Sequence, residues 1–434
     1  MSLQLSSAAL LGFITCASSY VFQQKRRRLP PSPVSYHIIG NLFTAPSLSE
    51  HLGYKKISED LKSDVICLKL LGNTVVVLHS ASEWVNDVIG RKLLNWKNGV
   101  ALTEYGGRFR GHRRIFNKLL SKNAIRSFHD RLLFQNQQML NRWLEFNGTS
   151  VFSDRLVSEL DRLTVSAVVG ATYGYDITSL DDPLVCSIRR VQDNFSKCAL
   201  PTSFLVSMVP ALAHIPSWFS GAEWQRVVRE WGLEKDRVIE ETFQWTCDQM
   251  AKGTAKPSII GSILEDYEGQ DISDEEKDVI KQVAIAPFAA GSDTTASTLS
   301  AFVLAMLLFL DTQRKAQAEI DRIVGSDRLP DIADLPSLPY LNNMVQELLR
   351  WQPVLPLGVA HTCSQDNVYR GYFIPEGAIV MGNIWGINRY ANVYKEPEVF
   401  NPDRFLDPSV PPPSTFGWVD GSAMEYIMPN YFYA

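Results

Sequence analysis

One polar stretch interrupts a long apolar run, the sequence AAGSDTTAS at 289–297. A buried helix rarely carries an acid and two threonines in its middle, because an unpaired buried carboxylate is costly. The Thr294 hydroxyl can donate to the carbonyl of Ala290, and Gly291 allows the helix to widen or bend there. The resulting groove beside Gly291, lined by Thr294 and the Asp293 carboxyl, could hold a small ligand and relay protons to it. A helix kink whose polar groups are satisfied by neighbouring residues is the alternative.

A second group of charged residues lies nearer the carboxyl end of the chain. The segment QELLR places Glu347 and Arg350 on one helical face, and Pro353 ends that helix just beyond. Most such pairs lie at the surface and contribute about 0.3 kcal/mol. Arg404, in the segment EPEVFNPDRFLD, could join them in a buried network or lie on the surface.

The segment YGGRFRGHRRIFNKLLSKNAIR is strongly basic, although the chain as a whole carries a net charge of −5. A solvated helix face is one explanation. The other is that one arginine turns inward to hold an anionic group while the outward ones bind an acidic protein partner. The overall negative charge argues against a nucleic-acid partner. The basic residues are Arg108, Arg110, Arg113, Arg114, Lys118, Lys122 and Arg126.

The polar stretch lies within the longest helix that the sequence predicts. Ser273 and Glu276 form a capping box at its start, and the apolar pattern continues to Asp311. Pro287 should kink this helix without ending it. A helix of about 35 residues is roughly 50 Å long, enough to cross a whole domain. A transmembrane span is the rival interpretation, which the charged residues within the segment disfavour.

The remaining patterns predict a mainly α protein with a small β portion. The residues DVICLKLLGNTVVVLHS indicate a hairpin turning near Gly72, and the residues 366–383 indicate strands and turns. Residues 105–250 are helical in pattern, with a proline-bearing break near 207–221. Since no repeat or flexible linker divides the chain, we expect a single domain over 42–434.

The amino-terminal segment has the features of a membrane anchor. Residues 2–24 carry no charge, and KRRR follows at once. About 20 predominantly apolar residues span a bilayer, and basic residues stay on the cytoplasmic side. We therefore expect an anchor over 1–24, a basic, proline-rich hinge over 25–41, and a cytosolic body. A cleavable signal or a buried helix is the alternative. The six scattered cysteines indicate reduced thiols.

Taken in this order, these segments resemble those of a cytochrome P450, a membrane-anchored haem-thiolate monooxygenase, over nearly the whole chain. The wording of the proline hinge and the residues PSWF and NIWGINRY resemble the filamentous-fungal branch. The resemblance implies the cytochrome P450 fold, a haem cofactor, and a lipophilic substrate that receives one oxygen atom from O2. It also implies electrons from NADPH through a reductase, a place in secondary metabolite biosynthesis or detoxification, and a single-pass location in the endoplasmic reticulum membrane.

The resemblance also implies roles for individual residues. Arg113, in the motif Phe109-x-x-x-Arg113, would pair with a haem propionate, although the family usually has Trp at the first position. His361, in PLGVAHT, would contact a propionate as well.

On the long helix, Asp293 and Thr294 match the acid–alcohol pair that delivers protons to dioxygen, and Ala290 and Gly291 would line the cofactor. The residues Glu347, Arg350 and Arg404 match a buried structural triad.

The haem loop is where the sequence departs from the family pattern, which is Phe-x-x-Gly-x-x-x-Cys-x-Gly. Counting from Phe416, Val419 stands at the glycine position and Ala423 at the cysteine position, and no cysteine follows Cys363. No metal ligand is therefore predicted in this chain. One explanation is a truncated or mis-spliced form of a working enzyme. The other is a catalytically inactive, membrane-anchored binding protein; a helical scaffold that never bound haem is disfavoured by the mid-helix GSDTT.

Overall fold

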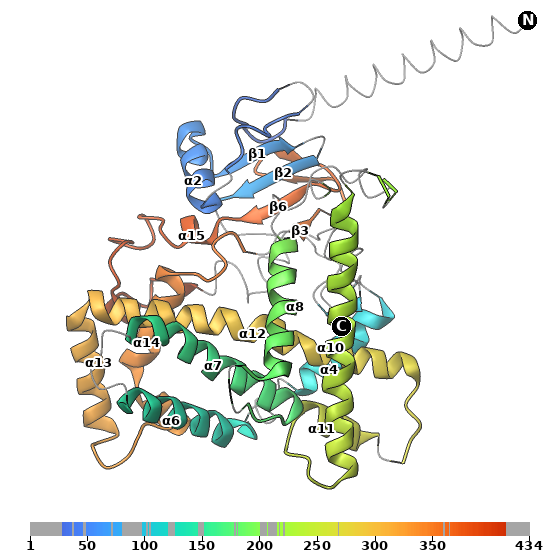
Figure 1. The fold of residues 1–434 in the computed structure, drawn as a ribbon. Helices are drawn as coiled ribbons and strands as arrows, with labels where there is room; N and C mark the ends of the chain where they lie inside the picture. The colour runs from blue at the N-terminus through green and yellow to red at the C-terminus, as the bar shows by residue number, and fades with distance from the viewer. Residues whose placement is uncertain are drawn as a thin grey trace, which may run out of the picture. The chain divides into compact units, whose positions relative to one another are not determined.

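A computed structural model describes most of the chain as two compact units (Figure 1). Unit 1 comprises Met1–Asn86, Leu355–Ile387 and Ser414–Ala434, and unit 2 comprises Asp87–Val354 and Asn388–Pro413. The predicted anchor and the haem-loop motif lie outside the described residues. The described residues are 28–36, 39–46, 49–70, 73–79, 98–100, 103, 106–119, 126–145, 152–177, 179, 181–199, 206, 215–216, 218–219, 222–267, 269–358, 361–363 and 365–413.

The long helix of unit 2, α12, spans Asp274–Leu308. The Ser273 side chain accepts from the Glu276 backbone N–H and the Glu276 side chain returns to Ser273, which confirms the predicted capping box. The helix also continues through Pro287, as expected.

The helix has 35 residues, in agreement with the predicted length of about 35. It ends before Asp311, to which the apolar pattern continues, because Phe309 leaves the helical conformation at φ −123° and ψ 68°. Its ring packs between Trp351 and Phe400, with ring centroids 5.9 Å away in both cases. A new helix, α13 (Leu310–Ile323), then departs with a bend of 105°. The aromatic cluster therefore fixes the end of α12, and the apolar pattern alone does not reveal it.

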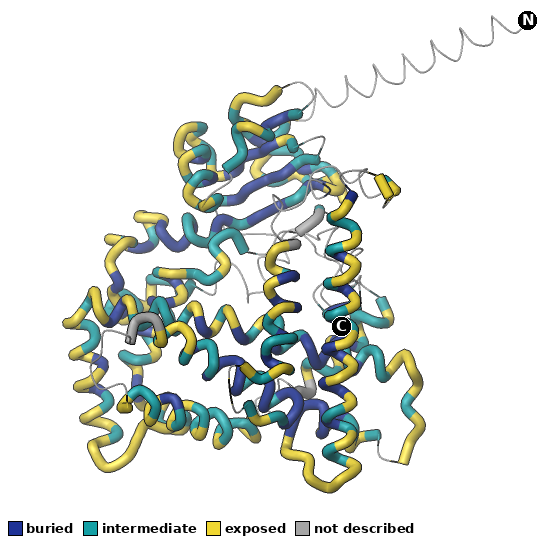
Figure 2. The backbone as a smooth tube through the Cα atoms, in the orientation of Figure 1, coloured by how far each residue is buried: buried dark blue, intermediate teal, exposed yellow. Residues whose placement is uncertain are grey.

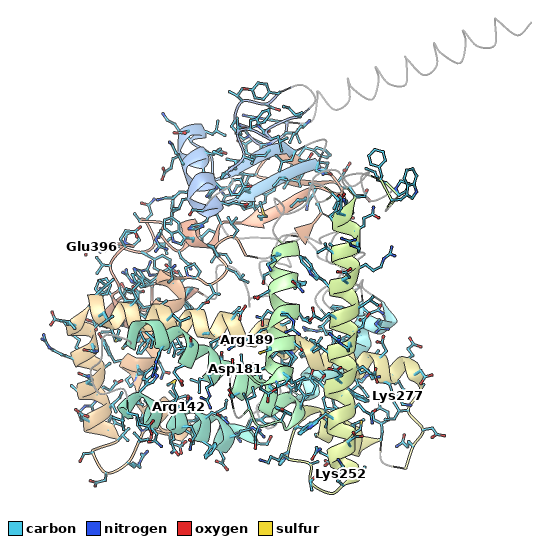
Figure 3. The ribbon with its side chains drawn as sticks, in the orientation of Figure 1. Arg142, Asp181, Arg189, Lys252, Lys277 and Glu396 are labelled. Atoms are coloured by element: carbon cyan, nitrogen blue, oxygen red, sulfur yellow. The ribbon has the colours of Figure 1, made fainter. Side chains whose placement is uncertain are left out.

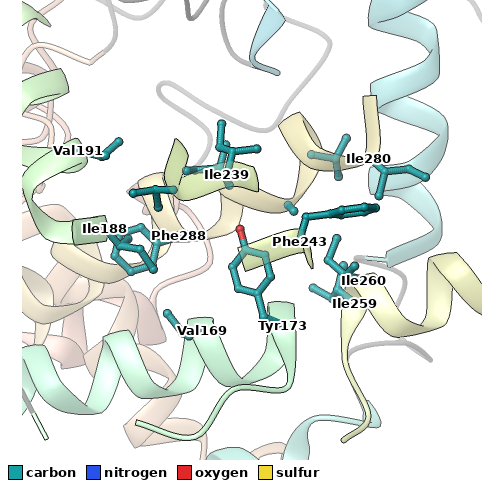
Figure 4. Close-up of a cluster of buried hydrophobic side chains, with 14 of the residues drawn as sticks. Val169, Tyr173, Ile188, Val191, Ile239, Phe243, Ile259, Ile260, Ile280 and Phe288 are labelled. Carbon is teal, nitrogen blue, oxygen red and sulfur yellow. The ribbon is translucent and has the colours of Figure 1, made fainter. Parts of the chain in front are cut away.

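Among the described residues, six further helices of unit 2 precede α12 in the chain. Five of them share one core with α12, in which Val169 and Tyr173 meet Ile188, Phe243 and Phe288 (Figure 4). The sixth, over His129–Glu145, packs through Met139 in a separate cluster. Helix α7 packs along α12 and α4 crosses it nearer its start. The helices are α4 (Gly107–Leu119), α6 (His129–Glu145), α7 (Phe152–Tyr173), α8 (Pro183–Ala199), α10 (Glu223–Ala251) and α11 (Ile259–Asp266).

A second core of unit 2 forms around the end of α12. It joins α13 to α14 (Pro339–Trp351) and contains Met306, Met344 and Phe400. Two short 3-10 helices, η3 (Ile332–Ser337) and η4 (Pro402–Leu406), flank α14. Helix α14 begins with proline and ends at Trp351, before Pro353, as predicted.

Unit 1 contains the strands. The sheet has the order β1-β2-β6-β3, in which β1 (Val65–Leu70) and β2 (Asn73–Leu78) form the predicted antiparallel hairpin. Strand β6 (Ile379–Gly382) pairs in parallel with β2, and β3 (His361–Thr362) pairs with β6. The first two strands are buried along most of their length (Figure 2).

A separate hairpin of unit 1 joins β4 (Asn367–Tyr369) to β5 (Tyr372–Ile374). Its two turn residues, Arg370 and Gly371, both have positive φ, the backbone that tight hairpins favour. Helices α2 (Glu50–Leu61) and α15 (Ile384–Ile387) complete unit 1. The predicted mainly α fold with a small β portion is confirmed.

Among the described helices, none is by itself long and apolar enough to cross a membrane. Helices α12 and α13 meet that test of length and composition only as a pair, across their 105° bend.

Candidate functional site

The polar stretch of α12 has two sides with different surroundings. Phe288, Ser292 and Ala296 recur at intervals of one turn and are buried. Ala290 and Asp293 lie on the other side of the helix and are exposed. A helix whose first half is largely enclosed by neighbours therefore presents an acid to an open side at its middle.

Thr294 lies on the same open side of α12. Its hydroxyl donates to the carbonyl oxygen of Ala290 over 2.5 Å, the hydrogen bond that the sequence predicted. The same bond recurs one turn later, where the Thr298 hydroxyl donates to the carbonyl of Thr294 over 2.8 Å. The Thr294 oxygen keeps lone pairs that can accept a further hydrogen bond from a ligand or an acid.

Gly291 faces helix α7. A Cβ added at this glycine would lie 3.2 Å from Cγ2 of Val168, on α7. Close packing of α7 on α12 therefore explains the glycine. Its predicted contact with a cofactor stays a prediction, and the open side is formed by Ala290, Asp293 and Thr294.

Charged residues of two other helices act electrostatically on the Asp293 carboxyl. Partial burial raises its pKa, and the negative charges of Asp161 (α7) and Asp193 (α8) raise it further. Arg189 of α8, labelled in Figure 3, opposes this shift and lowers the pKa. A carboxyl whose pKa is raised holds its proton closer to neutral pH, which suits a group that delivers protons.

The basic helix α4 turns one arginine inward and others outward. Arg108 forms an ion pair with Asp278 of α12. Arg110, Arg113 and Arg114 are exposed. The arginine held by a protein carboxylate is thus Arg108, and Arg113 has its guanidinium accessible to a ligand.

The two predicted propionate partners lie in different units. Arg113 belongs to unit 2, whereas His361 belongs to unit 1, where its backbone pairs with Val380 across β3 and β6. The side chain of His361 lies outside the described part of the chain. The predicted role of His361 therefore stays a prediction.

Glu347, Arg350 and Arg404 come together in a buried network of unit 2. Arg350 binds both carboxylate oxygens of Glu347, with Nε and Nη2 at 2.8 and 2.9 Å. The Nε of Arg404 lies 3.1 and 3.0 Å from the same two oxygens. The side chains of Glu347 and Arg350 are 0% exposed, and that of Arg404 is 6% exposed.

Main-chain groups complete this network. The backbone N–H of Asn401 donates to Glu347, and Arg350 donates to the carbonyl of Asn388 over 2.9 Å. Arg404 donates to the carbonyls of Lys395 and Val399. Every charged group of the triad is thus paired, and it holds the chain after α15 and η4 against α14.

Two residues that support these clusters were not predicted. Arg389 is buried, donates to the carbonyl of Trp351 over 2.7 Å, and has its pKa lowered by burial. Arg189 forms an ion pair with Asp161. Neither lies at a helical interval from its partner, so no spacing pattern in the sequence indicates it.

The haem that the resemblance implies can be tested against these residues. The open side of α12 offers a small side chain at Ala290 with an acid and a hydroxyl beside it, and Arg113 offers an accessible guanidinium for a carboxylate. These residues fit the distal side of a flat cofactor. Ala423, at the family's ligand position, has no atom that can bind iron. The axial ligand is therefore not assigned.

Comparisons with known proteins identify the family of the chain. The sequence model of the family "Cytochrome P450" matches residues 30–419. A cytochrome P450 monooxygenase of Armillaria gallica is 34% identical over 405 residues, which cover 89% of this chain and 78% of that protein. Cytochrome P450 monooxygenase 208 of Postia placenta is 35% identical over 400 residues, or 88% and 76% of the two chains. Cytochrome P450 monooxygenase COX2 of Coprinopsis cinerea is 32% identical over 438 residues, or 96% and 82%. With a family match over most of its length and relatives at this identity, the chain belongs to the cytochrome P450 family of haem-dependent oxidoreductases.

Proposed function

We propose that this chain is a monooxygenase that inserts one oxygen atom from O2 into a lipophilic substrate. The observation that carries the proposal is the acid–alcohol pair, Asp293 and Thr294, on the open side of a helix that neighbouring helices otherwise enclose. The names of its fungal relatives, all cytochrome P450 monooxygenases, support the same activity.

The chain's own residues supply proton delivery and binding. Haem, when bound, supplies the activation of oxygen. Thr294 is oriented by its hydrogen bond to Ala290, so that its oxygen lies at a fixed place on the open side. Asp293, whose pKa is raised, retains its proton to a higher pH than an ordinary carboxyl and can release it toward the Thr294 oxygen. Arg113 would hold a carboxylate of the cofactor by a charge-assisted hydrogen bond.

The exposed basic side of α4 is the surface that we assign to the electron donor. Arg110 and Arg114 are exposed on this helix, and Arg113 lies between them. An acidic face on an NADPH-dependent reductase would be attracted to this surface and steered onto it. The charge pattern supports an acidic protein partner.

The proposal extends to location and pathway. The uncharged residues 2–24 followed by KRRR support an anchor in the endoplasmic reticulum membrane with the catalytic domain in the cytosol. The fungal source of the relatives is what supports extending the proposal to secondary metabolite biosynthesis or detoxification.

One specific observation favours a second function. Ala423 stands where the family has its ligating cysteine. Without a thiolate at this position, the chain could still bind a lipophilic molecule at a membrane without transforming it.

Spectroscopy of the purified full chain separates the two functions. We would add haem, reduce the sample, and introduce carbon monoxide. A thiolate-type Soret band supports the monooxygenase, because that band requires a sulfur ligand on iron. Its absence, together with retained binding of lipophilic compounds, would support the binding protein.

Haem titration tests the role of Arg113. Arg113→Ala should weaken haem binding roughly tenfold, the effect of losing a charge-assisted hydrogen bond of about 1.5 kcal/mol. The matched control is Arg114→Ala, which removes the neighbouring exposed guanidinium and should leave haem affinity unchanged. Equal losses in both variants would contradict the assignment.

The coupling of oxygen use to product formation tests Thr294. In a haem-loaded sample that turns over, Thr294→Ala should raise the ratio of O2 consumed to product formed severalfold, because the oriented hydroxyl is lost. Thr298→Ala removes the equivalent hydrogen bond one turn later and is the control. An unchanged ratio in Thr294→Ala would remove the proton-delivery role.

A further inference from the structure

We propose that Arg189 of α8 and Asp161 of α7 are positioning residues for Asp293. The carboxyl groups of Asp161 and Asp293 compete for the guanidinium of Arg189, and the outcome decides how readily Asp293 releases its proton. The inference rests on the proposed function in so far as Asp293 delivers protons. It assigns to two helices outside α12 a control over the acid of that helix.

A hydrogen bond between α12 and α8 places these residues together. The Ser292 hydroxyl donates to Oε1 of Gln192 over 2.9 Å, and both side chains are buried. Asp293 follows Ser292 directly. On α8, Arg189 lies one turn before Gln192 and Asp193 lies next to it. The buried bond thus holds Arg189 and Asp193 at the level of Asp293.

The guanidinium of Arg189 is only partly committed. Its Nη2 binds a carboxylate oxygen of Asp161, in an ion pair whose side chains are 29% and 28% exposed. Its Nε is buried and has no hydrogen-bond partner among the described residues. An arginine carries five N–H donors, and a buried donor without a partner is costly. The side chain can therefore satisfy a second carboxylate without leaving the cluster.

The charges in this cluster do not balance. The guanidinium of Arg189 binds Asp161 and lowers the pKa of both Asp161 and Asp293, while the negative charge of Asp193 raises both. These are the charged groups of α7 and α8 that act on Asp293. Burial and Asp193 raise the pKa of Asp161 as well, while Arg189 lowers it. Crowded like charges favour retention of a proton by one member of the group.

The consequence is a cluster with two arrangements. With Arg189 on Asp161, Asp293 has no ion-pair partner among the described residues, and its raised pKa lets it retain its proton to a higher pH. When Asp293 releases that proton to an acceptor on the open side, it becomes a carboxylate that the guanidinium can pair with, and the released proton is replaced later from water. No electron moves, and only one O–H bond breaks and reforms in each cycle.

Infrared spectroscopy of the carboxyl groups tests this without haem or turnover. The protonated carboxyl band of Asp293 would be assigned by its loss in Asp293→Asn and followed with pH in the full chain. Arg189→Met should move the midpoint up by on the order of half a pH unit, because a positive charge is removed. Asp161→Asn should move it down by a similar amount, because a negative charge is removed and Arg189 is freed.

The opposite directions of these shifts distinguish the proposal from a merely structural role. Arg190→Met removes the neighbouring arginine, which pairs with Glu234, and should leave the midpoint unchanged. Arg189→Lys keeps the charge and should restore most of the parent value. If Arg189→Met fails to fold, Arg189→Gln, which also removes the positive charge, takes its place. Shifts of equal sign, or no shift in either variant, would overturn the proposal.

The same variants separate this inference from the proposed function. If the midpoints shift as expected but Asp293→Asn leaves oxygen coupling unchanged, the cluster is upheld and the proton-delivery role of Asp293 fails. If coupling depends on Asp293 but the midpoints do not shift, the reverse holds.

Discussion

Two clusters of unit 2 combine carboxylates with arginine, and they differ in how fully their polar groups are paired. In the cluster around Glu347, one carboxylate is bound by two arginines and a backbone N–H, and the arginines also reach main-chain carbonyls. In the cluster around Asp293, Arg189 is bonded to Asp161 alone, its Nε has no partner among the described residues, and Asp161 and Asp193 both raise the pKa of Asp293.

The difference separates a structural role from a chemical one. A buried charge that is fully paired has no capacity left for a ligand. Removal of one partner leaves the remaining charges uncompensated in a low-dielectric interior. A partly paired carboxyl at an open helix side keeps a proton that it can exchange. The same residue types therefore stabilise the fold in one place and remain available for chemistry in the other.

The largest expected effect comes from a substitution that breaks the cluster around Glu347. Glu347→Gln leaves the guanidinium groups of Arg350 and Arg404 buried without their counter-ion, so we expect a loss of about 3–5 kcal/mol in the free energy of unfolding. Urea denaturation followed by circular dichroism measures this. The matched control is Asp311→Asn: Asp311 pairs with Arg314 at the same i,i+3 spacing, with side chains 92% and 72% exposed. That change should cost less than about 1 kcal/mol. Similar losses in both variants would show that burial of the triad does not matter.

The second effect concerns a buried group with no partner at all. His112 on α4 is 0% exposed, and neither ring nitrogen has a partner among the described residues. Burial, with Arg108 next, lowers its pKa to about 4.

Because the unfolded chain then binds a proton at His112 more readily than the folded chain, stability is complete above about pH 6.5 and is lost as the pH falls toward 4. The loss at the lower end is on the order of 3 kcal/mol. Denaturation midpoints measured across this range should fall less steeply for His112→Asn than for the parent chain. Parallel curves would contradict the prediction.

The smallest expected effect on the free energy of unfolding comes from the same acid-to-amide change made at Asp293, on the open side of α12. Asp293→Asn removes a carboxylate from a crowded negative cluster, so the free energy of unfolding at neutral pH should stay within about 0.5 kcal/mol of the parent value or rise slightly. The sign follows from the raised pKa, because ionised Asp293 destabilises the folded state at neutral pH. The same urea experiment measures it. A loss comparable to that of Glu347→Gln would remove the distinction between the two clusters.

The features that the sequence predicted well depend on residues close together in the chain. The Ser273–Glu276 capping box, the Thr294–Ala290 hydrogen bond and the Glu347–Arg350 pair span three or four residues each. Helical geometry alone places such residues in contact. The β1–β2 hairpin is local as well, because its two strands follow each other directly in the chain.

The features that it missed join residues far apart in the chain. The end of α12 at Leu308 depends on Phe309 meeting Trp351 and Phe400. The ion pair of Arg189 with Asp161 and the buried bond of Gln192 with Ser292 likewise cross between helices. Such contacts are set by how the helices pack, which no local spacing encodes.

By itself, the sequence determined that an acid and an alcohol stand in the middle of a long apolar helix, since composition and helical spacing fix that regardless of the neighbours. Only the tertiary structure decided which side of the helix is open, that Gly291 faces Val168, and that Arg189, Asp161 and Asp193 act electrostatically on Asp293. The physical reason is that the charge state of a carboxyl depends on its solvation and on charges nearby in space, and residues from α7 and α8 reach Asp293 only when the helices are packed.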